Sequence, residues 1–247
     1  MKTLEPTLRQ GLAELGLALS DTQIAQLLAY LALIKKWTKV YNLTAVRAPA
    51  QMLTHHLLDS LAVIAPLRRQ LQQGCVDPAV ASDELCPSSA VQPQTVRPVR
   101  LLDVGSGAGL PGVVIAICCP DVAVHCVDTV AKKAAFIKQV AVTLKLSNLR
   151  GVHARVENLT DKYDIISSRA FASLADFTTW SVKALAEQGV WMAMKGKHPA
   201  DEVAALSADV QVFHVEQLQV PGLDAERCMV WMRPAVVGLT SGNMTLR

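Results

Sequence analysis

The sequence lacks the signals that mark secreted, membrane-spanning and metal-binding proteins. No pair of its six cysteines has C-x-x-C spacing, and four of the six lie inside apolar runs. This pattern favours buried, reduced thiols over disulfides or metal ligands. The segment from Met1 to Glu5 carries charge and no apolar signal core, and no stretch has 18 consecutive apolar residues. We therefore expect a cytoplasmic protein with no metal and no membrane partner.

A strong net charge is also missing. The formal charge is +3 over 247 residues, of which 51% are hydrophobic. That balance neither requires nor excludes a nucleic-acid partner, and the apolar content predicts a large buried core. The local distribution is more informative: residues 1–69 hold eight Lys and Arg against four Asp and Glu, a local excess of +4.

Composition and periodicity divide the chain into a helical N-terminal extension, a flexible insertion, a core and a frayed tail. Their bounds are 1–69, 70–98, 99–234 and 235–247. In the extension, apolar residues at helical spacing predict three helices, with a loop over 37–44 and a helix end at Pro66. The helices are expected at 3–16, 22–37 and 49–66. The insertion contains four prolines and no periodic pattern, which is typical of a linker.

From Arg100 onward, strand and helix patterns alternate. Strands are predicted at 100–104, 122–127, 150–154, 164–168, 189–195, 210–217 and 227–233. Helices are predicted at 112–118, 131–145, 173–186 and 199–207. This alternation predicts an α/β fold with a mostly parallel, seven-stranded sheet and helices on both faces. The last two strands are consecutive, so they can pair as a hairpin and add an antiparallel strand.

A glycine-rich turn follows the first of these strands. Gly107, Gly109 and Gly112 fit the G-x-G-x-x-G pattern of dinucleotide-binding folds. Asp103, Gly105, Gly107 and Gly109 equally fit D-x-G-x-G-x-G, the first motif of class I methyltransferases. A carboxylate at Asp103 would repel a pyrophosphate but tolerate the cationic groups of S-adenosylmethionine. The turn therefore favours a methyltransferase over a nicotinamide-dependent oxidoreductase.

The ends of the second and third strands carry further candidates for a nucleoside site. Asp128 ends the second strand about 20 residues after the glycines, where an acid can bind ribose hydroxyls; it can also cap the following helix. Val156 and Glu157 follow the third strand. In a methyltransferase this position lines the adenine pocket, although Glu157 can equally act as a capping acid.

Basic residues end the fourth and fifth strands. Arg169 follows the fourth strand, and Lys195 and Lys197 follow the fifth. Ligands bind at the carboxyl edge of parallel strands in open α/β sheets. Cations at this edge suit a substrate that carries phosphate.

Five motifs are spread over the chain, and together they resemble one family. They are Tyr41-Asn42-Leu43-Thr44-x-x-Arg47, His56-x-x-Asp59-Ser60, Asp103 to Gly112, Ser168-Arg169-Ala170-Phe171-Ala172-Ser173-Leu174, and Lys195-Gly196. This combination is similar to the bacterial small-subunit rRNA guanine-N7 methyltransferases, also called glucose-inhibited division protein B. The resemblance runs from about residue 5 to 233, with the insertion at 70–98 outside the family pattern.

The resemblance implies a class I, Rossmann-like methyltransferase fold with a helical N-terminal extension. It implies methyl transfer from S-adenosylmethionine to N7 of a guanosine in 16S rRNA near the decoding region. The implied cofactor contacts are Gly105, Leu110, Asp128, Val156, Glu157 and Arg169. The candidates for positioning or substrate contact are Asn42, Arg47, His56 and Asp59. A second imidazole, His55, adjoins His56, and the motif register favours His56.

Methyl transfer to N7 of guanine makes few chemical demands on the candidate residues. N7 of guanine offers a lone pair and carries no proton, so its methylation needs no general base. His56 can then simply hydrogen-bond Asp59 one turn along a helix. The basic extension, including Lys36 and Lys39, can contact RNA phosphates or be an ordinary solvated face. We expect a monomer, and a non-catalytic RNA-binding module remains an alternative.

Overall fold

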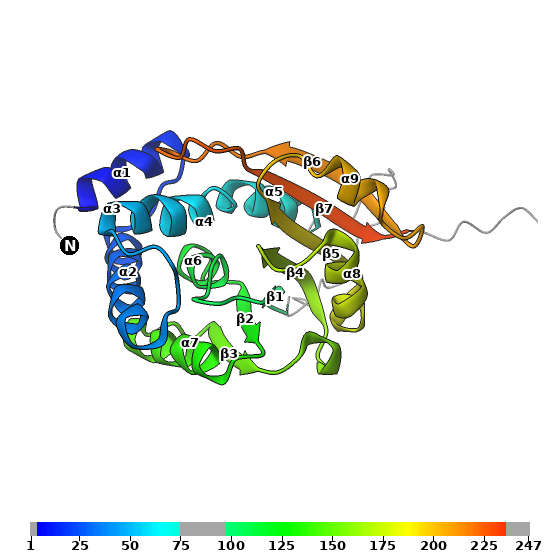
Figure 1. Cartoon of the computed structure of the whole chain (residues 1–247), viewed down its shortest axis with the longest axis horizontal. Coiled ribbons are helices and arrows are strands. Elements are labelled where there is room, and N and C mark those ends of the chain that lie inside the picture. Colours follow the sequence, from blue (N-terminus) through cyan, green and yellow to red (C-terminus); the bar gives the residue numbers. More distant parts are fainter. Residues whose placement is uncertain (1–3, 75–96, 236–247) are drawn as a thin grey trace, which may run out of the picture.

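The computed structural model describes residues 4–74 and 97–235, which build one sheet with helices on both faces (Figure 1). Within these residues the sheet has seven strands in the order β3-β2-β1-β4-β5-β7-β6. They are β1 (Arg100–Val104), β2 (Ala123–Asp128), β3 (Leu149–His153), β4 (Tyr163–Arg169), β5 (Leu185–Lys195), β6 (Val210–Gln217) and β7 (Cys228–Pro234). β1 to β5 are parallel, and β7 is antiparallel to both β5 and β6. The predicted sheet, including its final antiparallel hairpin, is confirmed.

Side chains of the central strands alternate between two apolar cores, one on each face of the sheet. In β1, Leu101 enters the first core and Leu102 the second; in β2, Val124 and Val127 divide in the same way. Helices α6 (Gly112–Cys118) and α7 (Ala131–Leu144) cover the first core, and α8 (Leu174–Ser181) covers the second. A short helix, α9 (Ala200–Ala204), lies beside α8 (Figure 1). Burial on both faces explains why these strands read as apolar runs.

The N-terminal helices join the first core and do not build one of their own. They are α1 (Glu5–Glu14), α2 (Asp21–Tyr41), α3 (Pro49–Met52), a π-helical segment (Leu53–Leu58), α4 (Asp59–Leu61) and α5 (Ile64–Gly74). Leu27 and Leu57 are fully buried in the same cluster as Val113 and Ile137. The helices therefore add a further layer over α6 and α7 (Figure 1). The proposed division into four segments stays a prediction.

Three helix boundaries differ from the prediction. α2 continues through Tyr41, so the first half of the predicted 37–44 loop is helical; Asn42, in the left-handed conformation, ends it. The predicted 49–66 helix is interrupted by the π-helical segment. Pro66 does not end a helix but lies in the first turn of α5, where its missing N–H costs no hydrogen bond.

Later bounds also shift. The predicted 173–186 helix ends at Ser181, and β5 already begins at Leu185 after a single 3-10 turn. Of the predicted insertion, residues 70–74 belong to α5, and 75–96 lie outside the described residues. The predicted frayed tail lies outside them as well, apart from Ala235.

Candidate functional site

The glycine turn between β1 and α6 is tied to the end of β2. The Ser106 N–H donates to the Val127 carbonyl at 3.2 Å, and the Gly107 N–H donates to Asp128 Oδ2 at 3.1 Å. Gly105 has φ +63°, and a Cβ there would collide with the ring of Phe171. Glycine is therefore required at this position both by the backbone angle and by the close approach of an aromatic ring.

Asp103 lies beneath the turn and lines neither of the clefts described below. Its side chain is fully buried; Oδ2 accepts the Gly112 N–H at 3.0 Å, and Oδ1 accepts the Ser167 hydroxyl at 2.9 Å. Burial raises its pKa from 3.8 to about 6. The sequence predicts this carboxylate beside the charged groups of a ligand. In the structure it instead anchors the first residue of α6.

The first cleft lies at the carboxyl ends of β1, β2 and β4 and has a volume of about 400 Å³. It brings together Gly105, Asp128, Val156 and Glu157, which sequence analysis selected separately. Two aromatic residues that sequence analysis did not select complete its wall, Phe171 and Trp180. Their rings meet edge to face, with centroids 5.8 Å apart. The cleft therefore combines apolar and aromatic groups with the charged side chains of Asp128, Lys133, Arg155 and Glu157.

Asp128 is buried at the base of this cleft. Besides the Gly107 N–H, it accepts the Val130 N–H at 2.9 Å through Oδ1, and Lys133 Nζ lies 3.4 Å from Oδ2. The carboxylate thus fixes both the glycine turn and the start of α7. An ionised carboxylate has about four acceptor positions, so it keeps capacity for further donors.

A second cleft of about 530 Å³ adjoins the first. Gly105 and Ala170 line both clefts and form their common wall. The second cleft is otherwise lined by side chains from the N-terminal helices and their loop, the glycine turn and the ends of β4 and β5. Its polar lining residues are Thr44, His55, His56, Asp59, Ser106, Arg169, Lys195 and Arg227, and Gly107 and Leu110 also line it.

Asp59 holds two guanidinium groups at this second cleft. Its Oδ2 accepts Arg169 NH1 at 2.7 Å and its Oδ1 accepts Arg227 Nε at 2.8 Å. The Asp59 side chain is 4% exposed, while the two arginines keep 20% and 23%. The carboxylate is thereby neutralised and both cations are fixed at the surface of the cleft. Sequence analysis missed Arg227, which lies 168 residues from Asp59.

His56 does not make the hydrogen bond to Asp59 that one helical turn would allow. Its Nε2 lies 2.9 Å from the Thr44 hydroxyl, and Asp59 is taken by the two arginines. Burial lowers the pKa of His56, so the imidazole is neutral at neutral pH. His56 belongs to the π-helical segment, a geometry often found at functional sites.

Asn42 and Arg47 line neither cleft. Arg47 NH2 donates to Asn42 Oδ1 at 2.8 Å, and Arg47 NH1 donates to the Thr38 carbonyl at 3.3 Å. The pair therefore closes the loop that follows α2. The same loop places Thr44 in the second cleft, so Asn42 and Arg47 act on the site through its position.

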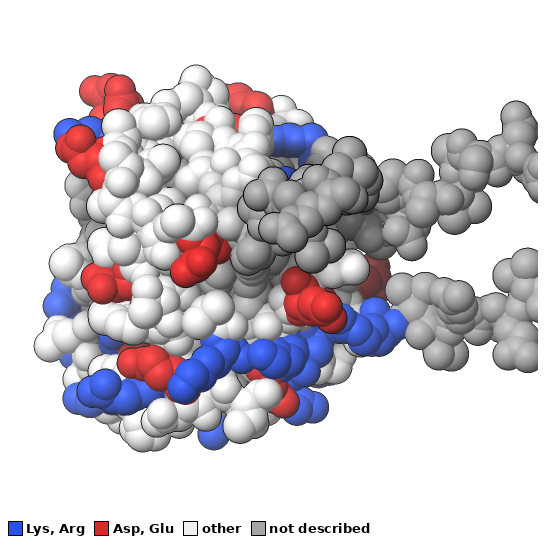
Figure 2. All heavy atoms as spheres, turned by 90° about the vertical axis from the view of Figure 1, so that its right-hand side faces the viewer, with Lys and Arg blue, Asp and Glu red and all other residues white. Residues whose placement is uncertain are grey.

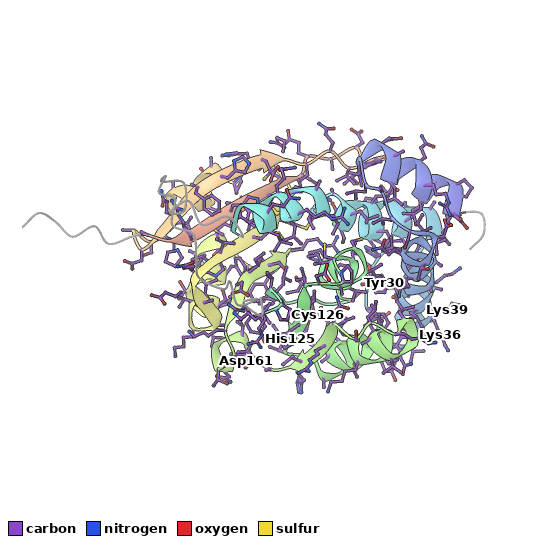
Figure 3. The ribbon with its side chains drawn as sticks, turned by 180° about the vertical axis from the view of Figure 1, so that it is seen from behind. Tyr30, Lys36, Lys39, His125, Cys126 and Asp161 are labelled. Atoms are coloured by element: carbon purple, nitrogen blue, oxygen red, sulfur yellow. The ribbon has the colours of Figure 1, made fainter. Side chains whose placement is uncertain are left out.

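The remaining candidates differ in their surroundings. Lys195 lines the second cleft, and its Nζ donates to the Ala172 carbonyl at 3.0 Å and to Glu202 at 2.7 Å. Gly109 lines neither cleft; a Cβ there would collide with Ile137 and Val113. Lys197 lies beyond the lining. Lys36 and Lys39 lie on the surface of α2 beside α7 (Figure 3).

The described residues offer neither a metal site nor a membrane-spanning helix. In 4–74 and 97–235 there is no group of three or more His, Cys, Asp or Glu that could hold a metal ion. None of the helices in these ranges is both long and apolar enough to cross a membrane. The cysteines at 118, 119, 126 and 228 are buried thiols.

Comparisons with known proteins give a consistent result over nearly the whole chain. A family model described as GidB, rRNA small subunit methyltransferase G, matches residues 23–78 and 82–230. The ribosomal RNA small subunit methyltransferase G of Albidiferax ferrireducens is 67% identical over 96% of this chain and 100% of its own length. That of Polaromonas naphthalenivorans is 63% identical over 94% and 97%. The structure of a ribosomal protein L11 methylase from Lactobacillus delbrueckii subsp. bulgaricus aligns with 57% of this chain and 72% of its own, at 14% identity and a TM-score of 0.45.

Proposed function

Because the chain belongs to the rRNA small subunit methyltransferase G family, we propose that its two adjoining clefts form one site that methylates N7 of a guanosine in 16S rRNA. The chain is an rRNA methyltransferase that depends on S-adenosylmethionine, with the class I fold that the sequence predicts. The observation that carries the proposal is the common wall of the clefts at Gly105 and Ala170. A donor bound in one cleft and an acceptor bound in the other meet at this wall.

The residues of the first cleft fit the adenosine half of the cofactor. Val156, Phe171 and Trp180 offer apolar surface to a purine ring, and Glu157 can accept a hydrogen bond from its exocyclic amine. Asp128 keeps acceptor capacity for ribose hydroxyls after its backbone bonds are made. When bound, S-adenosylmethionine supplies a methyl group that its sulfonium charge already activates.

The second cleft suits an acceptor that needs orientation but no proton removal. N7 of guanine has an exposed lone pair and no hydrogen. His56, neutral and hydrogen-bonded to Thr44, is not required as a base. We assign it a positioning role, in which it holds the loop after α2 against the π-helical segment. Holding the base in line with the donor can lower the barrier by several kcal/mol.

The cations of the second cleft are placed to bind anionic groups. Asp59 fixes Arg169 and Arg227, and Glu202 fixes Lys195, which leaves other N–H groups of these side chains available. We assign Arg169 to the carboxylate of the cofactor, and Arg227 and Lys195 to phosphates beside the target base. Lys197, just beyond, can extend this contact. Positive charge develops on the guanine ring during transfer, so the cations belong at its periphery.

Action as a monomer stays a prediction. A ribosomal RNA substrate supports a cytoplasmic location. Family membership argues against a nicotinamide-dependent oxidoreductase. The presence of both clefts in one chain argues against a non-catalytic RNA-binding module.

The proposal is tested by methyl transfer from labelled S-adenosylmethionine to 16S rRNA from an unmodified source, supplied both protein-free and in small subunits. We expect label in a single guanosine. Transcripts in which 7-deazaguanosine replaces guanosine lack N7 and should take up no label; label in them would refute N7 as the acceptor. Calorimetric titration should show binding of S-adenosylmethionine and not of NAD.

A further inference from the structure

The paired helices α2 and α7 carry a cationic surface outside the linings of the two clefts. Building on the proposed function, we propose that this surface binds phosphates of 16S rRNA beside the two clefts, with Tyr41 stacking on an unpaired base. This surface is the α2/α7 face. It consists of the exposed residues Lys35, Lys36, Lys39, Tyr41, Lys132 and Lys138.

Acidic residues are missing from the two segments that build this face. Residues 22–58 and 129–156 contain ten Lys and Arg and no Asp or Glu. The rest of the chain holds the other 14 Lys and Arg with all 21 Asp and Glu. The near-balanced total therefore conceals a separation of charge, with an excess of +10 in these two segments and of −7 elsewhere. Such a separation is the pattern expected for a surface that meets a polyanion.

The fold places the two acid-free segments side by side. Three contacts pair α2 with α7 in opposite directions: Gln26 Nε2 donates to the Leu144 carbonyl at 2.9 Å, Trp37 packs on Phe136 with centroids 5.3 Å apart, and Lys132 Nζ lies 5.9 Å from the ring centroid of Tyr41. Exposed lysines of both helices therefore contribute to one surface. Lys36 and Lys39 lie where α2 passes α7, away from His125 and Asp161 (Figure 3).

Other faces differ. Arg100 pairs with Asp161 at 3.0 Å near the amino ends of the parallel strands. On the face in Figure 2, which is the right-hand side of Figure 1, basic and acidic side chains lie next to one another. The α2/α7 face is thus distinguished by unopposed positive charge.

The α2/α7 face leads directly into both clefts. Lys132 is flanked by Val130 and Lys133, which line the first cleft. At the end of α2, the chain continues through Asn42 to Thr44, which lines the second cleft. RNA bound to this face therefore passes the place where the donor and the target base meet. At 1.5 Å per residue, Lys132 and Lys138 lie about 9 Å apart along the axis of α7.

Tyr41 is the aromatic residue at the junction of the face and the clefts. Its side chain is 42% exposed, and its ring packs against Trp37 with centroids 5.1 Å apart. Trp37 is half-buried against Phe136 and so gives Tyr41 a rigid support. A supported, exposed ring beside a lysine is suited to stack on an unpaired base while the ammonium binds a phosphate.

The experiment compares two double variants that each remove two positive charges. Lys36→Ala/Lys39→Ala changes the α2/α7 face. Lys162→Ala/Lys183→Ala changes exposed lysines at the amino ends of β4 and β5 and is the control. RNA affinity is measured with protein-free 16S rRNA at several salt concentrations, and affinity for S-adenosylmethionine is measured by calorimetry.

We expect the face variant to bind RNA more weakly and to lower the slope of log affinity against log salt by about 1.4 to 1.8, at 0.7 to 0.9 per phosphate contact. The control variant should keep the wild-type slope. Cofactor affinity should be unchanged in both. An RNA affinity and slope equal to those of the control would overturn the proposal.

Tyr41 is tested separately, because its role is stacking. Tyr41→Ala should weaken RNA binding roughly tenfold, and Tyr41→Phe, which keeps the ring, should bind like the wild type. Equal binding by both variants would remove Tyr41 from the proposal. The Lys36→Ala/Lys39→Ala variant could instead bind protein-free rRNA normally and bind only assembled small subunits more weakly. In that case the partner of the face is a ribosomal protein, and the assignment to RNA is wrong. A wild-type protein that methylates no rRNA refutes the proposed function instead, whatever the variants bind.

Discussion

Replacing Asp103 by Asn should change how stability depends on pH. The carboxylate is fully buried between the Gly112 N–H and the Ser167 hydroxyl. An amide can satisfy the same partners: its oxygen accepts the Gly112 N–H and its NH2 donates to Ser167 Oγ. The Ser167 hydroxyl can then donate to the Leu102 carbonyl, which is already 3.4 Å away. Asp103→Asn therefore removes the charge and keeps the hydrogen bonds.

The raised pKa of Asp103 determines whether stability rises or falls with pH. The folded protein holds the Asp103 proton more tightly than the unfolded chain, so the group favours the fold when protonated, and stability is lost as pH rises from 3.8 to about 6. At about 1.4 kcal/mol per pH unit, this difference amounts to about 3 kcal/mol. From about pH 7 the destabilisation by the buried carboxylate is fully present in the wild type, and it is absent from Asp103→Asn at every pH. The stability of the variant relative to the wild type should therefore rise with pH and level off near pH 7.

Urea unfolding of the wild type and of Asp103→Asn between pH 4.5 and 8 measures the difference between their free energies of unfolding. Between pH 4.5 and 6 it should grow by about 2 kcal/mol in favour of Asp103→Asn. Ser167→Ala is the matched variant: it removes a hydrogen bond that lowers the pKa of Asp103, so the titration should move to higher pH. A difference that is independent of pH, or one that shrinks as pH rises, would refute the reasoning.

Four further changes test the site. Asp128→Ala should weaken calorimetric binding of S-adenosylmethionine by at least about tenfold, because hydrogen bonds to a charged group are lost; unchanged affinity would remove Asp128 from the ribose. Asp59→Ala leaves two guanidinium groups without their carboxylate and should cost about 3 kcal/mol in urea unfolding and raise the KM for RNA; full stability would contradict the network. Gly105→Ala, at φ +63° and against Phe171, should weaken cofactor binding by about tenfold or more, and normal binding would argue against the close approach. His56→Gln should keep the shape of the kcat profile between pH 6 and 9, and loss of a fall in kcat on the acidic side of the wild-type profile would show that the imidazole acts as a base.

The core of the fold could be predicted from the sequence, and the N-terminal helices only in part. A strand that is buried on both faces appears in the sequence as a continuous apolar run that ends in Asp, Gly or Arg. This pattern can be recognised from neighbouring residues alone. The bounds of the N-terminal helices depend on tertiary contacts. Trp37 remains helical because it packs on Phe136, a residue 99 positions away in the sequence. Pro66 predicts a helix end because proline lacks an N–H and its ring disrupts the preceding helical turn, yet proline also fits the first turn of a new helix.

The first cleft was predictable for a similar reason. Parallel strands end at the same edge, so Asp128, Val156 and Glu157 had to converge there once the strands were assigned, with Arg169 at the adjoining second cleft. Asp103 also ends a strand, but its side chain points beneath the turn toward Gly112 and not into the cleft. The sequence places a residue at an edge and does not say on which side of the turn its carboxylate lies. That direction is set by hydrogen bonds that form only in the folded chain.

Arg227 reaches the site because β7 is antiparallel to its neighbours in the sheet. A strand parallel to β5 brings its carboxyl end to the site, but β7 is antiparallel, so its amino end lies there instead. The residue just before Cys228 is therefore delivered to the same edge as Arg169 and Lys195. The predicted hairpin contained this information, because two consecutive final strands imply one reversed strand. In a sheet of this kind, the residues immediately before an antiparallel strand are therefore site candidates. Here this position is held by Arg227, which the structure shows bound to Asp59 at the second cleft.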